Sequence, residues 1–229
     1  MATPDVWTRA LPREAEFWRH WLTTEHRIAR LSPRQTDPGL VGKIIDRAGP
    51  VIRLLDVGAG PLTTLSASWP DRTVVVVPVD ALAAEYDVLL HEAGISPPIR
   101  TLPIHGERLG DAFPGDYFDA VNCDNALDHF YDPIRAVHQM LAVTRPGGLV
   151  RVISRENEGE NEQYRGLHQW NICAEGDDAR IWNRQGVDIR WRQEFPEAAM
   201  TTYMEPAYDP PAFVILLRKP YVKPSMWGM

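Results

Sequence analysis

The sequence predicts an α/β fold, a doubly wound parallel sheet with helices on both faces. Two observations carry this prediction. Residues 51–57 and 72–80 are apolar and partly β-branched runs, as in strands that are buried on both faces. Helical patterns at 81–93 and 134–143 alternate with further strand-like runs at 99–104, 118–121 and 149–154. Strands that alternate with helices in this way are typical of βαβ units.

Length and composition narrow the class of protein. The 229 residues are 44% hydrophobic and 24% charged, which suits one globular domain spanning residues 1–229. No apolar run approaches the ~18–20 residues of a membrane span, and the N-terminus lacks the apolar core of a signal peptide. Two cysteines without an export signal favour a cytoplasmic protein with reduced thiols. The net charge of −7, without a basic patch, disfavours nucleic acid as a partner.

The N-terminal region, residues 1–49, is predicted to be a helical cap. Residues 12–29 carry apolar side chains at helical spacing, and residues 40–48 give a second short helix. Tryptophans gather outside the central strands, and their flat rings suit either packing or the wall of a small-molecule site. Periodicity leaves open whether the first helix is a lid over the site or a contact in a homodimer.

The first strand runs into a glycine turn. Gly58, Ala59 and Gly60 follow it, and glycines let the backbone turn sharply and approach a ligand. Asp56 places a carboxylate before the turn, which favours a cationic or hydrogen-bond-donating ligand over a phosphate. Thr63 stands where a dinucleotide fingerprint has its third glycine, which argues against a nicotinamide dehydrogenase. Pro61 predicts that a helix begins directly after the turn.

The second strand ends at another carboxylate. Asp80 lies 24 positions after Asp56, where an acidic residue at a strand end accepts hydrogen bonds from both hydroxyls of a ribose. Because ligands of such sheets bind beyond the carboxyl ends of the strands, Asp56, Asp80, His105 and Asn125 are expected to converge.

These motifs resemble those of the class I S-adenosylmethionine-dependent methyltransferases. Asp56 to Gly60 is similar to the family's D-x-G-x-G motif, residues 104–109 to its adenine-binding turn with His105 in place of the usual Asp, and residues 125–129 to its active-site turn. The resemblance implies a Rossmann-like sheet of seven strands with the last antiparallel, S-adenosylmethionine as cofactor and S-adenosylhomocysteine as product. Residues 50–154 would form the cofactor-binding core. The implied cofactor-binding residues are Asp56, Gly58, Ala59, Gly60, Asp80, Ala81, Gly106, Glu107, Asn125 and Leu127.

Residues 155–229 are expected to form the acceptor side and the last strands, at 187–195 and 212–218. Residues 155–171 are too polar for a core, and their G-L-H-Q-W-N segment resembles a bacterial, methyltransferase type 11-like subgroup. Aromatic and amide side chains suit a hydroxyl-rich small molecule such as a sugar, a glycoside or another natural-product intermediate. The candidate substrate-binding residues are Tyr164, Gln169, Trp170 and Asn171.

Methyl transfer from a sulfonium requires a positioned acceptor that loses a proton. An imidazole titrates near neutral pH, so His129 and His168 are the candidate general bases and catalytic residues. Metal binding by Asp128, His129, Glu156 and His168 is an alternative, but their spacing matches no ligand motif, and we expect no metal. The expected activity is O- or N-methylation of a small molecule. Other sulfonium chemistry, such as aminocarboxypropyl transfer, and a non-catalytic binding module remain alternatives.

Overall fold

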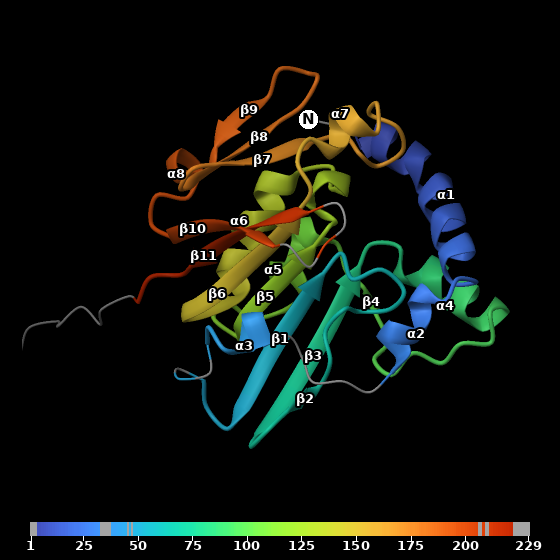
Figure 1. Ribbon diagram of the computed structural model, residues 1–229, viewed down its shortest axis with the longest axis horizontal. Coiled ribbons are helices and arrows are strands. Elements are labelled where there is room, and N and C mark those ends of the chain that lie inside the picture. Colours follow the sequence, from blue (N-terminus) through green and yellow to red (C-terminus); the bar gives the residue numbers. More distant parts are fainter. Residues whose placement is uncertain are drawn as a thin grey trace, which may run out of the picture.

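A computed structural model gives the fold (Figure 1) and describes residues 4–32, 38–44, 46, 48–205, 208 and 211–221. Its central sheet has the order β10-β11-β6-β5-β1-β3-β2, with β4 paired to β3. Four parallel strands form the middle: β1 (Val51–Val57), β3 (Arg72–Asp80), β5 (Phe118–Asp124) and β6 (Thr144–Ser154). The predicted α/β class, with a mostly parallel sheet between helices, is confirmed.

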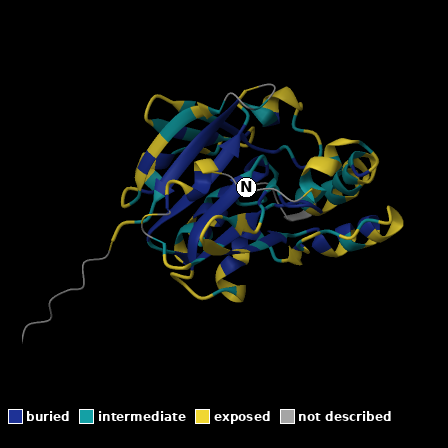
Figure 2. Cartoon of the chain, turned by 60° about the horizontal axis from the view of Figure 1, so that its bottom comes forward, coloured by how far each residue is buried: buried dark blue, intermediate teal, exposed yellow. Residues whose placement is uncertain are grey.

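Both faces of the sheet are covered, as the doubly wound prediction requires. Along β1, Ile52 and Leu54 belong to one buried cluster and Leu55 and Val57 to another, because successive side chains point to opposite faces. Helix α6 (Pro133–Val143) packs into the cluster of Leu55, and α3 (Pro38–Val41) packs into the other. Figure 2 shows the central strands as almost continuously buried, whereas the helices are buried on one side.

The last strands are antiparallel. β11 (Ala212–Arg218) has the predicted bounds and pairs antiparallel with β6, and β10 (Ala199–Glu205) forms the edge beside it. The strand predicted at 187–195 is wrong. Only β9 (Asp188–Arg190) is extended there, and α8 (Trp191–Glu194) follows because Trp191 turns inward and is fully buried. β10 therefore takes the place expected for that segment.

A second, smaller sheet holds the region that the sequence left ambiguous. β7 (Asn171–Glu175), β8 (Asp178–Trp182) and β9 form an antiparallel sheet of three strands. Ile172 and Ile181 are buried in the same cluster as α6, so this sheet extends the main core. In Figure 1 it lies above β10 and β11. The short helix α7 (Glu158–Asn161) precedes it and lies beside the N-terminal helix.

The helix predicted to begin at Pro61 is also wrong. Residues 61–67 form turns and irregular chain, and β2 (Ser68–Trp69) follows. Thr63 explains the difference, because its hydroxyl donates to Asp56 and accepts the amide hydrogen of Leu65. A side chain that bonds the local backbone in this way competes with helix formation. The strand predicted at 99–104 shortens to β4 (Leu102–Pro103).

The N-terminal helical region begins earlier than predicted and is interrupted. α1 (Pro4–Trp21) and α2 (His26–Leu31) replace the single helix expected at 12–29, and the described part of 40–48 begins with the end of α3 and a turn at 42–44. The hydroxyls of Thr23 and Thr24 donate to carbonyls of the last turn of α1 and end it. α1 packs on α4 (Ala83–Glu92) through Trp18, Trp21 and Tyr86. Among the described residues, no helix is long and apolar enough to cross a bilayer.

Candidate functional site

A cavity of about 490 Å³ lies beyond the carboxyl ends of β1, β3 and β5. Its size is within the ~300–1,000 Å³ range of small-molecule sites. Residues from α1, from the glycine turn and from the loop after β6 line it together. Ten of the residues proposed from the sequence line this cavity: Asp56, Gly58, Ala59, Asp80, Ala81, Gly106, Glu107, Asn125, His129 and His168.

The glycine turn has a backbone that side chains would disturb. Gly58 and Gly60 have positive φ angles of 72° and 65°. A Cβ on Gly58 would lie 2.5 Å from the Cβ of Ala126, and one on Gly60 would lie 2.7 Å from the Trp18 ring. Ala59 donates its amide hydrogen to the carbonyl of Val79, which ties the turn to the end of β3. Gly60 therefore shapes the turn beneath Trp18 without lining the cavity itself.

Asp56 was expected to contact a ligand, but its carboxylate is hydrogen-bonded to other side chains of the protein. Its side chain is buried, and its two oxygens accept hydrogen bonds from Thr63 Oγ1 at 2.5 Å and Asn122 Nδ2 at 2.7 Å. Asn122 in turn accepts from Arg151 Nε at 2.8 Å. Burial raises the pKa of Asp56 despite these donors. The Asp56 carboxylate thus joins β1, β5 and the glycine turn at the floor of the cavity.

Asp80 has its carboxylate fixed from two sides. Oδ2 accepts from the amide of Gly60 at 3.0 Å and Oδ1 from the amide of Leu82 at 2.9 Å. Burial raises the pKa of Asp80 to about 6. Each carboxylate oxygen keeps a further lone pair, so the group can accept hydrogen bonds from a ligand in the cavity.

The turn expected to contact adenine is built around Glu107. This side chain is buried and accepts from the amides of Tyr131 at 3.1 Å and Asp132 at 3.4 Å. Burial raises its pKa to about 7. Gly106 leaves room for the Phe130 ring, 2.7 Å from where a Cβ would lie, and His105 packs on Trp7.

Asn125 and Leu127 follow β5 in different ways. Asn125 has a φ of 51°, a left-handed conformation that asparagine tolerates, and its amide donates to the carbonyl of Ile153. It lines the cavity. The side chain of Leu127 is fully buried in the core beside α6 and does not line the cavity.

Two histidines that line the cavity, His129 and His168, meet one buried aspartate, Asp128. His168 Nδ1 lies 2.7 Å from Asp128 Oδ2 and 3.1 Å from His129 Nε2. Burial alone would lower the pKa of His168, but the hydrogen bond and charge of Asp128 outweigh it, and the pKa lies above its ordinary value. His129 sits on the short 3₁₀ helix η3 (Leu127–His129), and its carbonyl accepts from Trp7 Nε1 at 2.9 Å. His129 and His168 are 39 positions apart in the sequence, and the fold brings them into contact.

The residues expected to contact an acceptor do different work. Tyr164, Gln169, Trp170 and Asn171 do not line the cavity. Gln169 donates to the carbonyl of Tyr164, Asn171 donates to the Tyr164 hydroxyl, and Trp170 Nε1 donates to the carbonyl of Phe130. The Gln169 and Asn171 bonds lie within the loop of residues 155–171, and the Trp170 bond ties this loop to Phe130, so these residues hold the loop that carries His168.

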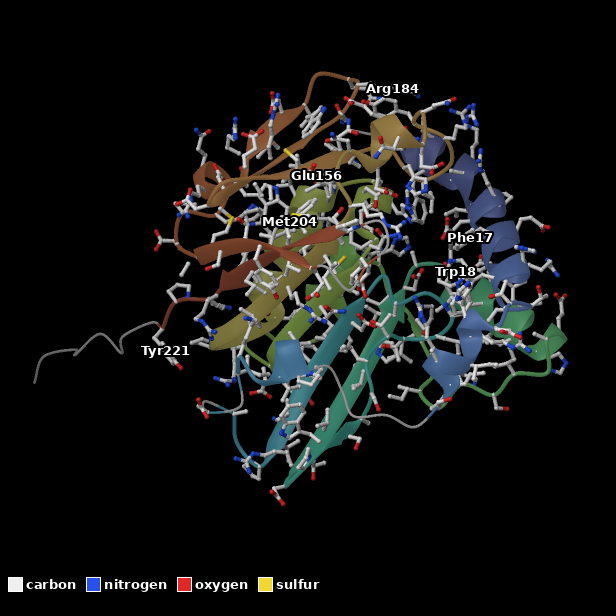
Figure 3. All side chains as sticks on the ribbon, in the orientation of Figure 1. Phe17, Trp18, Glu156, Arg184, Met204 and Tyr221 are labelled. Carbon is white, nitrogen blue, oxygen red and sulfur yellow. The ribbon has the colours of Figure 1, made fainter. Side chains whose placement is uncertain are left out.

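Several lining residues were not identified from the sequence. α1 contributes three tryptophans and a phenylalanine, and Figure 3 shows Phe17 and Trp18 on the side of the fold where α4 lies. Tryptophans at helical spacing on α1 were the only signal for this wall. The lining residues that sequence reasoning did not assign to the site include Trp7, Phe17, Trp18, Trp21, Tyr86, Phe130, Arg155, Glu158, Glu162 and Tyr208.

Carboxylates outnumber guanidinium groups in the described wall of the cavity. Arg30 and Arg155 face a larger set of acidic residues: Glu14, Asp56, Asp80, Glu107, Asp124, Glu158 and Glu162. Such a field favours a ligand that carries positive charge.

Comparisons with known proteins identify a methyltransferase domain in this chain. Residues 55–152 match a family model described as a methyltransferase domain. The ubiquinone biosynthesis O-methyltransferase of Bordetella bronchiseptica is 34% identical over 119 residues, 50% of this chain and 48% of that protein. The chain thus matches about half the length of its curated relatives.

Solved structures share the fold. The 1,6-didemethyltoxoflavin-N1-methyltransferase of Burkholderia thailandensis, solved with 1,6-didemethyltoxoflavin and S-adenosylhomocysteine bound, superposes with a TM-score of 0.52 at 16% identity, covering 96% of this chain and 92% of that one. The YcgJ protein of Bacillus subtilis gives 0.50 at 18% identity, covering 81% of this chain and all of the other.

Proposed function

We propose that the chain is a class I S-adenosylmethionine-dependent methyltransferase and that it methylates an oxygen or nitrogen of a small polar molecule. One observation carries the proposal. Residues of the glycine turn, Asp80, His129 and His168 line the same cavity, and the buried Asp128 contacts His168 from behind it. A cofactor at the first and an acceptor at the second would therefore meet inside one site.

The first half of the cavity suits the cofactor. Asp80 would accept hydrogen bonds from the ribose hydroxyls, and Gly58 and Ala59 of the glycine turn line the cavity beside it. The adenine would lie near Glu107, where backbone atoms of the turn are available. The acidic wall favours the sulfonium cation of S-adenosylmethionine over an anionic nucleotide.

The second half suits an acceptor that must lose a proton. In methyl transfer the carbon–sulfur bond breaks, a bond forms from the methyl carbon to the acceptor atom, and the acceptor's proton departs. His129 and His168 lie at this side of the cavity and would promote that departure. In the simplest form of the chemistry, an imidazole takes the proton as a general base. The name of the matched relatives supports an oxygen acceptor, and a sugar, glycoside or other hydroxyl-bearing natural product is the class we propose.

The test begins with the cofactor. Calorimetric titration of the full chain with S-adenosylmethionine and S-adenosylhomocysteine should show binding of both, and titration with NAD should show none. Panels of sugars, phenols and amines are then incubated with S-adenosylmethionine, and products are identified by mass. A product heavier by one methylene unit supports methyl transfer, whereas addition of an aminocarboxypropyl group would replace it with the alternative chemistry.

A variant then connects the cluster to turnover. His129→Ala should retain S-adenosylhomocysteine binding and lose methyl transfer, since His129 belongs to the acceptor side. Binding of neither sulfur nucleotide by the parent protein, or full turnover by His129→Ala, would contradict the proposal.

A further inference from the structure

Three potential ligand atoms converge at one point beside the cavity. Asp128 Oδ2 and His168 Nδ1 are 2.7 Å apart, His168 Nδ1 and His129 Nε2 are 3.1 Å apart, and His129 Nε2 and Asp128 Oδ2 are 3.6 Å apart. Each residue offers one atom, and the three come from η3 and from the loop after β6. Glu158 adds a second carboxylate, with Oε2 3.8 Å from His168 Nδ1.

Hydrogen bonding alone satisfies this cluster poorly. His168 Nδ1 lies within hydrogen-bond distance of two partners and can carry only one proton. When the proton of His168 Nδ1 points toward Asp128 Oδ2, it cannot also point toward His129 Nε2, although both of these atoms lie close to His168 Nδ1. A single cation held between the three atoms would accept a lone pair from each of them.

The spacing fits a metal ion. Ligand atoms about 2.1 Å from one ion, with angles of roughly 80–120° between them, lie ~2.7–3.6 Å apart. The three observed distances span that range. We therefore infer that Asp128, His129 and His168 form a binding site for one divalent transition-metal ion, such as Zn²⁺.

The donor set selects the class of ion. Two imidazoles and one carboxylate suit transition metals, whereas Mg²⁺ and Ca²⁺ prefer oxygen ligands. Glu158 lies beside the group, with Oε2 3.8 Å from His168 Nδ1, but does not belong to it. Glu156, which the sequence suggested as a ligand, does not belong to the convergent group.

The site would act on the acceptor, and this step rests on the proposed function. His129, His168 and Glu158 all line the cavity, so the ion's remaining positions would face an acceptor there. A bound metal ion lowers the pKa of an oxygen ligand, as it does for water. An acceptor hydroxyl on the ion would lose its proton to solvent and be methylated as the alkoxide. The histidines would then act as metal ligands, and neither would serve as the general base.

The test measures metal binding directly. The full chain is freed of metal with a chelator and titrated by calorimetry with ZnCl₂, and with MgCl₂ for comparison. We expect one Zn²⁺ per chain and weaker binding of Mg²⁺. Asp128→Asn, His129→Ala and His168→Ala should each weaken Zn²⁺ binding at least about tenfold, since ligands matter at least as much as the partners that orient them. Co²⁺ gives a second readout, because its visible spectrum should report nitrogen ligands in the parent protein and change in each variant.

His138→Ala is the matched control. His138 Nε2 pairs with Glu194 Oε1 at 2.7 Å on the surface, so the variant removes another histidine–carboxylate pair. It should bind Zn²⁺ like the parent protein. Asp128 is buried, but the two histidine side chains are only partly so, and circular dichroism verifies that each variant is folded.

Absence of Zn²⁺ binding by the parent protein, or equal binding by the three ligand variants and the parent, would overturn the inference. S-adenosylhomocysteine titrations separate it from the proposed function. Cofactor binding without metal binding refutes the site and leaves methyl transfer standing, whereas metal binding without cofactor binding supports the site and refutes the proposed function.

Discussion

Replacing Asp80 with asparagine tests the placement of the cofactor. The two carboxylate oxygens of Asp80 already accept from the amides of Gly60 and Leu82. In Asp80→Asn one oxygen becomes an amide nitrogen, which cannot accept from a ribose hydroxyl. A hydrogen bond to a charged group contributes ~1.5–3 kcal/mol, so S-adenosylhomocysteine should bind about 10- to 150-fold more weakly.

The pH dependence gives the same prediction an independent check. Burial raises the pKa of Asp80 to about 6 in the ligand-free protein, and the ionised carboxylate is the form that binds. Protonation on acidification therefore removes an acceptor. Between pH 7 and pH 5 the ionised fraction falls about tenfold, and the affinity of the parent protein should fall by about the same factor. Asp80→Asn lacks the group, so its affinity should change much less over this range.

Calorimetry with S-adenosylhomocysteine at both pH values provides the assay. Asp111→Asn serves as the control, because Asp111 forms an exposed ion pair with Arg108 away from the cavity lining. The reasoning is refuted if Asp80→Asn binds within about threefold of the parent protein at pH 7, or if the two proteins lose affinity in parallel on acidification.

Three further predictions concern the framework of the site. Thr63→Val removes a donor from the buried Asp56 carboxylate. The loss should lower the free energy of unfolding by ~1.5–3 kcal/mol and the melting temperature by roughly 3–12 °C. The control Thr73→Val changes an exposed threonine and should melt like the parent protein, and an equal loss in both variants would contradict the argument. Gly58→Ala should destabilise more than Gly94→Ala, since both glycines have positive φ but only the first has a neighbour within 4 Å of an added Cβ; calorimetric melting curves compare them, and equal losses would mean that the contact with Ala126 is relieved freely. Burial raises the pKa of Glu107 to about 7 from 4.5, so the folded state binds more protons than the unfolded state between these values, and stability contributed by this group falls by about 3 kcal/mol as pH rises from 4.5 to 7. Glu107→Gln should show a flatter profile in urea denaturation at several pH values, and a profile that parallels the parent's would rule out this assignment.

The middle of the fold followed from the sequence because its signals are local. Apolar, β-branched runs predicted β1 and β3, and helical periodicity predicted α6. The order of strands and helices then implied the parallel sheet. The order of strands also predicted that the glycine turn and Asp80 lie close together, because the carboxyl ends of neighbouring parallel strands meet at one edge of the sheet.

The errors arose where contacts of a side chain competed with the predicted backbone conformation. The hydroxyl of Thr63 bonds Asp56 and Leu65, which prevents the helix that Pro61 suggested. Trp191 turns the end of a predicted strand into α8 because burying its ring outweighs extension there. The residue types around Thr63 and Trp191 do not indicate that the Thr63 hydroxyl bonds Asp56 or that the Trp191 ring is buried.

The sequence by itself determined the parallel strands in the middle of the sheet, the glycine turn and the chemistry of the candidate residues, because periodicity and residue type are properties of short segments. Only the tertiary structure decided how those residues are used. It turned the amides of Gln169 and Asn171 inward to hold a loop, brought α1 over the cavity, and placed His168 beside Asp128 and His129. Contacts across 39 or 40 residues depend on how the whole chain packs, and no local pattern encodes them.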